Sequence, residues 1–129
     1  MSLNTQIIGK TMPHGFAGTY ARQPDMIVNT RPVGGTESIS FGTALKYDNG
    51  KVIVMGGTGT TAAQFAGIAG SEVKSALVYP DQNGGKYAPG EACSVFQRGS
   101  INVLCQRGTP ALGGDVYVRI AKTADYATA

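Results

Sequence analysis

The residues of this chain that come nearest to a chemical motif are glycines after a short apolar run. Lys51–Met55, apolar beyond its first residue, leads into the pattern Gly57-x-Gly59-x-x-Ala62, and Asp81 follows downstream. In a dinucleotide-binding unit, such glycines let the backbone approach a pyrophosphate at a helix N-terminus, and an acidic residue about 20 positions later binds the ribose. The pattern therefore raises the hypothesis of a dinucleotide-dependent enzyme.

The sequence around these glycines argues against that hypothesis. Asn49-Gly50 supplies the positive φ angles of a tight hairpin, so Lys51–Met55 is expected to be a returning hairpin strand, not the first strand of a parallel sheet. The one candidate helix, Thr60–Val73, contains two glycines, each of which costs up to about 1 kcal/mol relative to Ala. We interpret the glycines as a loop between strands and expect no cofactor.

No other set of side chains has the spacing of a catalytic or metal site. His14 is the only histidine and lies between Pro13 and Gly15 in an expected turn. Of the eight carboxylates, several lie in or beside turns, and no two are spaced as a general acid and base. Cys93 and Cys105 lack a CxxC arrangement and are expected to be buried thiols. We therefore predict no catalytic residue and no metal.

The composition limits the elements that can position any site. Among 129 residues, 19 are Gly and 6 are Pro, which weighs against a helical bundle. The apolar fraction of 42% is enough for the core of one domain, whereas the charged fraction of 15% argues against disorder and coiled coil. The chain contains no apolar run of about 18 residues or more and no signal-peptide pattern, so we expect it in the cytosol or in an assembly formed there.

Residues 36–121 have the pattern of short strands separated by turns. The expected turns include Asn49-Gly50 and a type II turn at Pro89-Gly90. A further hairpin is expected from Ala92–Gln97 and Ile101–Gln106, joined by Arg98-Gly99-Ser100. Its core face would carry Cys93, Val95, Ile101, Val103 and Cys105, with Cys93 opposite Cys105.

A last strand is expected at Asp115–Ile120, where Val116, Val118 and Ile120 would share one face. Together these elements predict a mainly β fold, a small antiparallel β-sandwich or barrel of jelly-roll type. Residues 122–129 lack the pattern and are expected to fray.

Residues 1–35, which we term the N-terminal arm, differ from this domain. Pro13, Pro24, Pro32 and several glycines prevent a continuous helix, so we expect an extended chain with turns. Its apolar side chains need a surface to pack on, either the arm's own domain or another subunit. We expect partner contacts from these side chains and from two arginines near the hairpin: Ile7, Ile8, Phe16, Tyr20, Ile27, Arg98 and Arg107.

Binding to nucleic acid is the alternative from another functional class. The formal charge of +3 permits weak attraction to a polyanion but is far from a basic stripe. A stacking surface requires aromatic residues interleaved with Lys and Arg, and only Phe96 with Arg98 and Tyr117 with Arg119 approach that pattern. A small nucleic-acid- or nucleotide-binding β-barrel domain therefore remains the second hypothesis, and we expect neither nucleic acid nor a membrane as the main partner.

Several short motifs occur along the chain in this order: His14-Gly15-Phe16-Ala17-Gly18, Met26-Ile27-Val28-Asn29-Thr30, Ile39-Ser40-Phe41-Gly42-Thr43-Ala44, Phe65-Ala66-Gly67-Ile68-Ala69, Tyr87-Ala88-Pro89-Gly90-Glu91 and Val95. Together they resemble a known family, the structural cement proteins of tailed bacteriophages, and the similarity covers residues 14 to 120. The resemblance implies a β-rich capsid decoration protein, often a homotrimer, without catalytic residues. It would be assembled in the host cytoplasm and sit on the outside of the virion's capsid, where it would clamp neighbouring copies of the major capsid protein.

Overall fold

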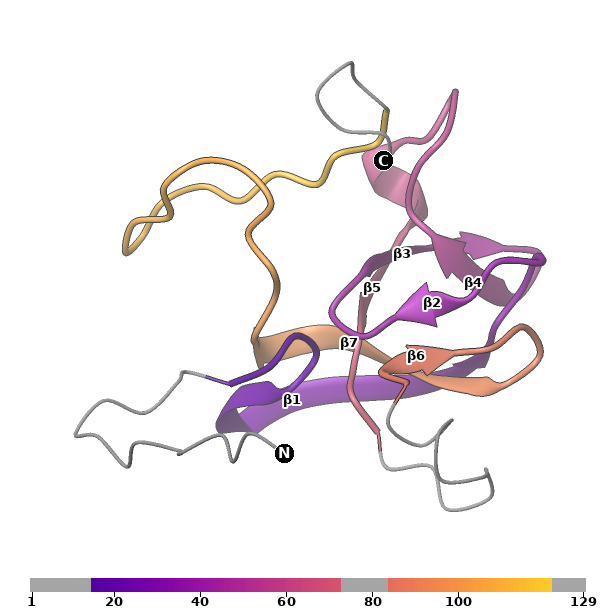
Figure 1. Cartoon of the computed structure of the whole chain (residues 1–129), viewed down its shortest axis with the longest axis horizontal. Helices are drawn as coiled ribbons and strands as arrows, with labels where there is room; N and C mark the ends of the chain where they lie inside the picture. The colour runs from indigo at the N-terminus through magenta and orange to yellow at the C-terminus, as the bar shows by residue number, and fades with distance from the viewer. Residues whose placement is uncertain (1–14, 73–83, 122–129) are drawn as a thin grey trace, which may run out of the picture.

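A computed structural model describes residues 15–72 and 84–121, and these residues form two antiparallel β-sheets (Figure 1). The larger sheet has five strands in the order β1-β7-β5-β3-β4, and the smaller pairs β2 with β6. The strands are β1 (Tyr20–Pro32), β2 (Ile39–Ser40), β3 (Ala44–Asp48), β4 (Lys51–Val54), β5 (Phe65–Ala69), β6 (Lys86–Tyr87) and β7 (Ala92–Ile101), and a 3-10 turn, η1, spans Ala62–Gln64. The predicted mainly β fold is confirmed, and the sheets are not closed into a barrel.

Several expected features lie outside the described residues. These are Ile7, Ile8, His14, Asp81 and the tail 122–129.

The predicted hairpin around Asn49-Gly50 is confirmed as the connection between β3 and β4. Asn49 has a φ of 47° and Gly50 a φ of 77°, the left-handed pair that a two-residue hairpin loop requires. Asp48 pairs with Lys51 across the turn. Val52 of β4 also forms an isolated parallel bridge with Val33, so the end of β1 reaches the far edge of the large sheet at one point.

The turn before β7 also has its predicted type. The Glu91 N–H donates to the Ala88 carbonyl at 3.1 Å, and Gly90 at the third position has a φ of +85°. A positive φ at this position defines a type II turn, with Pro89 before it.

The predicted helix at Thr60–Val73 is wrong in the part that the structure describes. Only η1 is helical, and β5 follows it directly. Gly67 explains the difference: its φ is +143°, and a Cβ there would lie 2.2 Å from the carbonyl oxygen of Phe96 on β7. The glycine that breaks the helix pattern thus allows β5 and β7 to approach closely.

The predicted hairpin around Arg98-Gly99-Ser100 is also wrong, because β7 runs without a turn from Ala92 to Ile101. Its partner is β1: Ile27 lies opposite Arg98, and Tyr20 lies opposite Ile101. Gly99 meets Met26, whose Cβ would lie 2.9 Å from an added Cβ, so the glycine accommodates an irregular stretch of β1.

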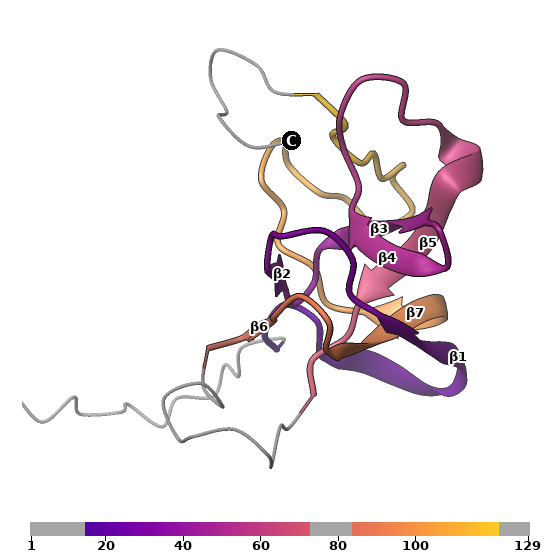
Figure 2. The ribbon, with the colours of Figure 1, turned by 90° about the vertical axis from the view of Figure 1, so that its right-hand side faces the viewer.

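With β1 as the partner of β7, the residues after Ile101 leave the large sheet. Cys93 is buried opposite Arg31, and Cys105 is exposed in the departing segment, so the two cysteines do not face each other. Residues 102–121 contain no helix or strand, which makes the predicted strand at Asp115–Ile120 wrong as well. We call residues 102–121 the extension; it projects away from the sheets in both views (Figures 1 and 2).

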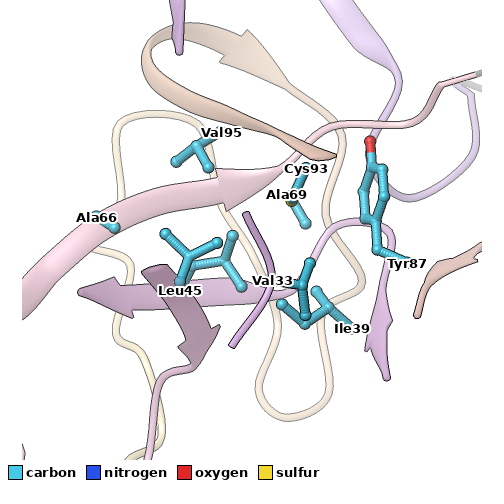
Figure 3. Packing of buried hydrophobic residues seen from close by; sticks show 9 residues of the cluster. Val33, Ile39, Leu45, Ala66, Ala69, Tyr87, Cys93 and Val95 are labelled. Carbon is cyan, nitrogen blue, oxygen red and sulfur yellow. The ribbon is translucent and has the colours of Figure 1, made fainter. Parts of the chain in front are cut away.

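The core lies between the large sheet and the β2–β6 pair (Figure 3). Tyr87 of β6 is fully buried, and its hydroxyl donates to the carbonyl of Gly70 at the end of β5. Its ring packs against Phe41 with 5.1 Å between the centroids. The other buried members are Val33, Ile39, Leu45, Val52, Ala66, Ala69, Cys93 and Val95. Tyr87 therefore ties the small sheet to the large one.

Burial, with the nearby Cys93 as the next cause, raises the pKa of Tyr87 from 10.0 to about 12. The unfolded chain releases this proton near pH 10 and the folded chain only near pH 12. The stabilisation linked to the protonated phenol is therefore present below pH 10 and declines as the pH rises towards 12.

We predict that Tyr87→Phe lowers the free energy of unfolding at pH 8 by about 1–3 kcal/mol, because the carbonyl of Gly70 loses a buried donor. Urea unfolding between pH 8 and 12 measures it, and the difference between the parent and the variant should shrink above pH 10. Tyr117→Phe, on an exposed side chain, is the control and should show neither effect. A difference that does not change up to pH 12 would contradict the assignment.

We predict that Gly67→Ala is far more damaging than Gly57→Ala. Both glycines have positive φ, but an added Cβ meets the Phe96 carbonyl only at position 67 and nothing within 4 Å at position 57. The clash should cost about 1–3 kcal/mol beyond the strain that the two variants share. Equal denaturation midpoints for the two variants would show that the contact between β5 and β7 is not tight.

Candidate interaction surface

One end of the β1–β7 ladder presents apolar side chains to solvent. Tyr20 and Ile27 are each 48% exposed. The inner face of the Tyr20 ring packs on Phe96, with 4.9 Å between the ring centroids. Tyr20 is therefore held in place by the domain while half of its side chain is available to a partner.

Phe16 is positioned by a tight turn directly before β1. The backbone N–H and the hydroxyl of Thr19 both donate to the Phe16 carbonyl, at 3.0 and 2.6 Å. Gly18, with a φ of +84°, lets this turn approach Phe41 and Ser71. The Phe16 side chain is left 78% exposed, although its backbone is fixed.

Asn102 attaches this turn to the start of the extension. Its backbone N–H donates to the Thr19 carbonyl at 2.9 Å, and its carbonyl accepts from Gly18 at 2.8 Å. Its side-chain amide donates to the Thr19 hydroxyl at 3.0 Å. The chain segment that carries Phe16 and the extension therefore leave the sheet at the same corner.

The two arginines expected at a partner surface are not brought together by a hairpin. Arg98 lies within β7 and forms an ion pair with Asp25 of β1 at 3.0 Å, with both side chains mostly exposed. A surface pair of this kind contributes at most about 1 kcal/mol, so Arg98 can exchange its partner at little cost. Arg107 lies in the extension, exposed, beyond the end of β7.

The extension contains exposed apolar residues, and those at 104, 116 and 117 lie in segments that the sequence predicts as strands. Leu104 is 75% exposed, Val116 84% and Tyr117 86%, and Leu112 is fully exposed. A monomeric protein seldom exposes so many large apolar side chains on one segment, and such a surface indicates an interaction site. The sequence signal for it is the run of turn formers Gly108, Pro110, Gly113 and Gly114.

The Gly-rich loop after β4 is held by Lys46 of β3 and by Thr60 of the loop itself. Lys46 on β3 donates from its ammonium group to the Gly56 carbonyl at 2.6 Å and to the Thr60 hydroxyl at 3.0 Å. The Thr60 hydroxyl also donates to the Gly56 carbonyl at 2.7 Å. Because β4 pairs antiparallel with β3 and η1 follows, the interpretation of a loop between strands is confirmed.

The pair Phe96 and Arg98 does not form a stacking surface for bases. Phe96 is buried beneath Tyr20, and its neighbour Arg98 is paired with Asp25. Among residues 15–72 and 84–121, no three His, Cys, Asp or Glu side chains gather as metal ligands. In the same part of the chain, no helix is long and apolar enough to cross a membrane.

The exposed apolar side chains at this corner indicate a protein that binds other proteins, and a comparison with known protein families agrees with that. The family model described as structural cement protein (E217 gp24/Pam3 gp6) matches residues 3–129. The chain belongs to the structural cement protein family. As the motifs from His14 to Val95 indicated, this cement protein is a structural protein of a bacteriophage capsid, and its family implies binding to capsid proteins. No curated protein and no solved structure matches the chain.

We predict that Phe16→Ala leaves the free energy of unfolding within about 0.5 kcal/mol of the parent, because most of the side chain is exposed. Tyr20→Ala should lower it by about 1–2 kcal/mol, because the ring packs on Phe96. Chemical denaturation of both variants measures this contrast. Destabilisation by Phe16→Ala as large as that by Tyr20→Ala would mean that Phe16 belongs to the core.

Proposed function

We propose that this cement protein binds the outside of a tailed-phage head and stabilises it by clamping neighbouring major capsid protein subunits. The observation that carries the proposal is Phe16, which is fixed by its backbone and exposed at the side chain. A side chain held in this way loses little conformational entropy when a partner covers it.

The contacts at this corner suit many weak attachments better than one tight attachment. Burying an exposed Leu, Ile or Phe side chain contributes about 1.5–3 kcal/mol, so one copy gains a modest amount from each capsid subunit. Contacts to two subunits at once multiply through avidity, and a homotrimer at a symmetry axis multiplies them again. A formal charge of +3 suits an acidic capsid exterior.

We assign the capsid contacts to the residues expected from the sequence. Phe16, Tyr20 and Ile27 supply apolar area at the start and middle of β1, and Ile7 and Ile8 of the N-terminal arm are further candidates for apolar capsid contacts. Arg98 and Arg107 supply cations for capsid carboxylates. Particles would acquire the protein during assembly in the host cytoplasm.

Sedimentation with undecorated capsids tests this function. The parent should sediment with the shell and raise the temperature at which the shell comes apart. Phe16→Asp should weaken the apparent affinity at least tenfold, because a carboxylate replaces an apolar contact. Thr58→Asp, which adds the same charge to an exposed loop beyond β4, is the matched control and should bind as the parent does.

Two outcomes would contradict the proposal. One is the absence of any cement protein in the capsid pellet at concentrations that saturate related decoration sites. The other is an equal loss of binding in Phe16→Asp and Thr58→Asp, which would mean that charge alone and not the corner around Phe16 governs attachment.

A further inference from the structure

The extension presents large apolar side chains on a segment that is tied to the domain at both of its ends. We propose that residues 103–117 of the extension are a second capsid-binding surface, which Leu112 anchors and which Asn102 holds in a fixed position relative to Phe16. This inference rests on the proposed capsid binding and deepens it, because it names a further contact with the capsid and the residue that orients that contact.

The extension begins at the turn that presents Phe16. The Asn102 N–H donates to the Thr19 carbonyl at 2.9 Å, and the Asn102 carbonyl accepts from Gly18 at 2.8 Å. The side-chain amide of Asn102 also donates to the Thr19 hydroxyl at 3.0 Å. A Cβ added at Gly15 would lie 2.6 Å from the side-chain nitrogen of Asn102, so the chain before Phe16 packs on the same side chain. A body that covers Phe16 therefore lies beside the start of the extension.

The other end of the extension is held by the loop that follows β4. The Ile120 carbonyl accepts from the Gly57 N–H at 2.9 Å. Val118 and Ile120 are 41% and 38% exposed, whereas Val116 and Tyr117 are 84% and 86% exposed. The last residues of the extension therefore pack on their own domain, and the part that is available to a partner ends at Tyr117.

Leu112 is presented by a tight turn within this available part. The Gly114 N–H donates to the Ala111 carbonyl at 3.1 Å, which closes the turn. Gly113 at the third position has a φ of +76°, so the turn is of type II, with Leu112 at its second position. The Leu112 side chain is fully exposed. Like Phe16, it is a large apolar side chain on a backbone that a turn already orders, so covering it costs little conformational entropy.

The capsid is the partner that these observations favour. Because Asn102 joins the extension to the turn of Phe16, the capsid surface that covers Phe16 continues over the extension. Residues 103–117 contain only two charged side chains, Arg107 and Asp115, so this part of the capsid surface must be largely apolar. A second copy could take up the extension as an exchanged arm only by breaking the bonds that hold both of its ends.

Sedimentation with undecorated capsids tests the role of Leu112. Leu112→Ala should weaken the apparent capsid affinity by about tenfold or more, because a buried leucine side chain is lost from the contact. Thr109→Ala removes an exposed side chain of the same segment without removing a large apolar group, and it should bind as the parent does. Both variants should unfold at the same denaturant concentration as the parent, since both positions are exposed.

A double-variant comparison tests Asn102 as a positioning residue. Asn102→Ala removes the side-chain bonds to Thr19 and frees the extension from the turn of Phe16. In this background, Leu112→Ala should weaken capsid binding by no more than about threefold further, because the anchor is no longer held in place. A purely structural role of Asn102 would leave the effect of Leu112→Ala at its full size.

The reactivity of Cys105 reports directly on what covers the extension. Cys105 lies in the extension and is exposed, whereas Cys93 is buried. Alkylation of Cys105 should be about tenfold slower, or more, in the capsid-bound protein than in the free protein, because the partner blocks access to the thiol. In the free protein the rate should not depend on protein concentration. Cys93 should stay unmodified in both states and serves as the internal control.

The possible failures are distinguishable. A parent protein that is absent from the capsid pellet would contradict the proposed function and this inference together. A parent that sediments with the shell while Leu112→Ala binds equally well, or while Cys105 reacts as fast as in the free protein, would overturn this inference alone. Alkylation of Cys105 that slows as the concentration of free protein rises would identify a second copy as the occupant and would also overturn it.

Discussion

The pairing of β1 with β7 is the interaction on which the rest of this molecule depends. It places Tyr20–Pro32 in the large sheet and makes β7 one uninterrupted strand of ten residues. A β7 that continues to Ile101 cannot fold back as a hairpin, so residues 102–121 leave the sheet as an exposed extension. The same pairing fixes the turn that presents Phe16. Both exposed surfaces of the protein thus originate at one ladder.

Packing behind this ladder depends on small residues and on one buried hydroxyl. Gly67 brings β5 against β7, and Tyr87 joins the small sheet to the end of β5. Neither contact exposes a reactive group. The domain is therefore a scaffold whose described surface offers apolar side chains and backbone edges, which are the means by which structural proteins bind one another.

Local sequence signals predicted the turns, whereas the pairing of the strands depended on contacts between segments distant in the sequence. Asn49-Gly50 and Pro89-Gly90 determine their turns through φ angles that few other residues adopt, so the sequence alone located them. Gly99 was ambiguous because a glycine serves a hairpin loop and a strand irregularity equally well. The presence of β1, about 70 residues earlier, decided between them. The sequence predicted exposed apolar residues around Phe16, because the N-terminal arm has no apolar partners of its own. It did not predict the exposed extension, because apolar and other residues alternate there as they do in a half-buried strand.

The central claim is that this cement protein joins capsid subunits through the surfaces that the β1–β7 ladder creates. A reconstruction of the decorated capsid tests this claim most directly. The account predicts density for the protein on the outer shell, with Phe16 against the major capsid protein. A capsid that carries the protein with Phe16 in solvent would contradict it.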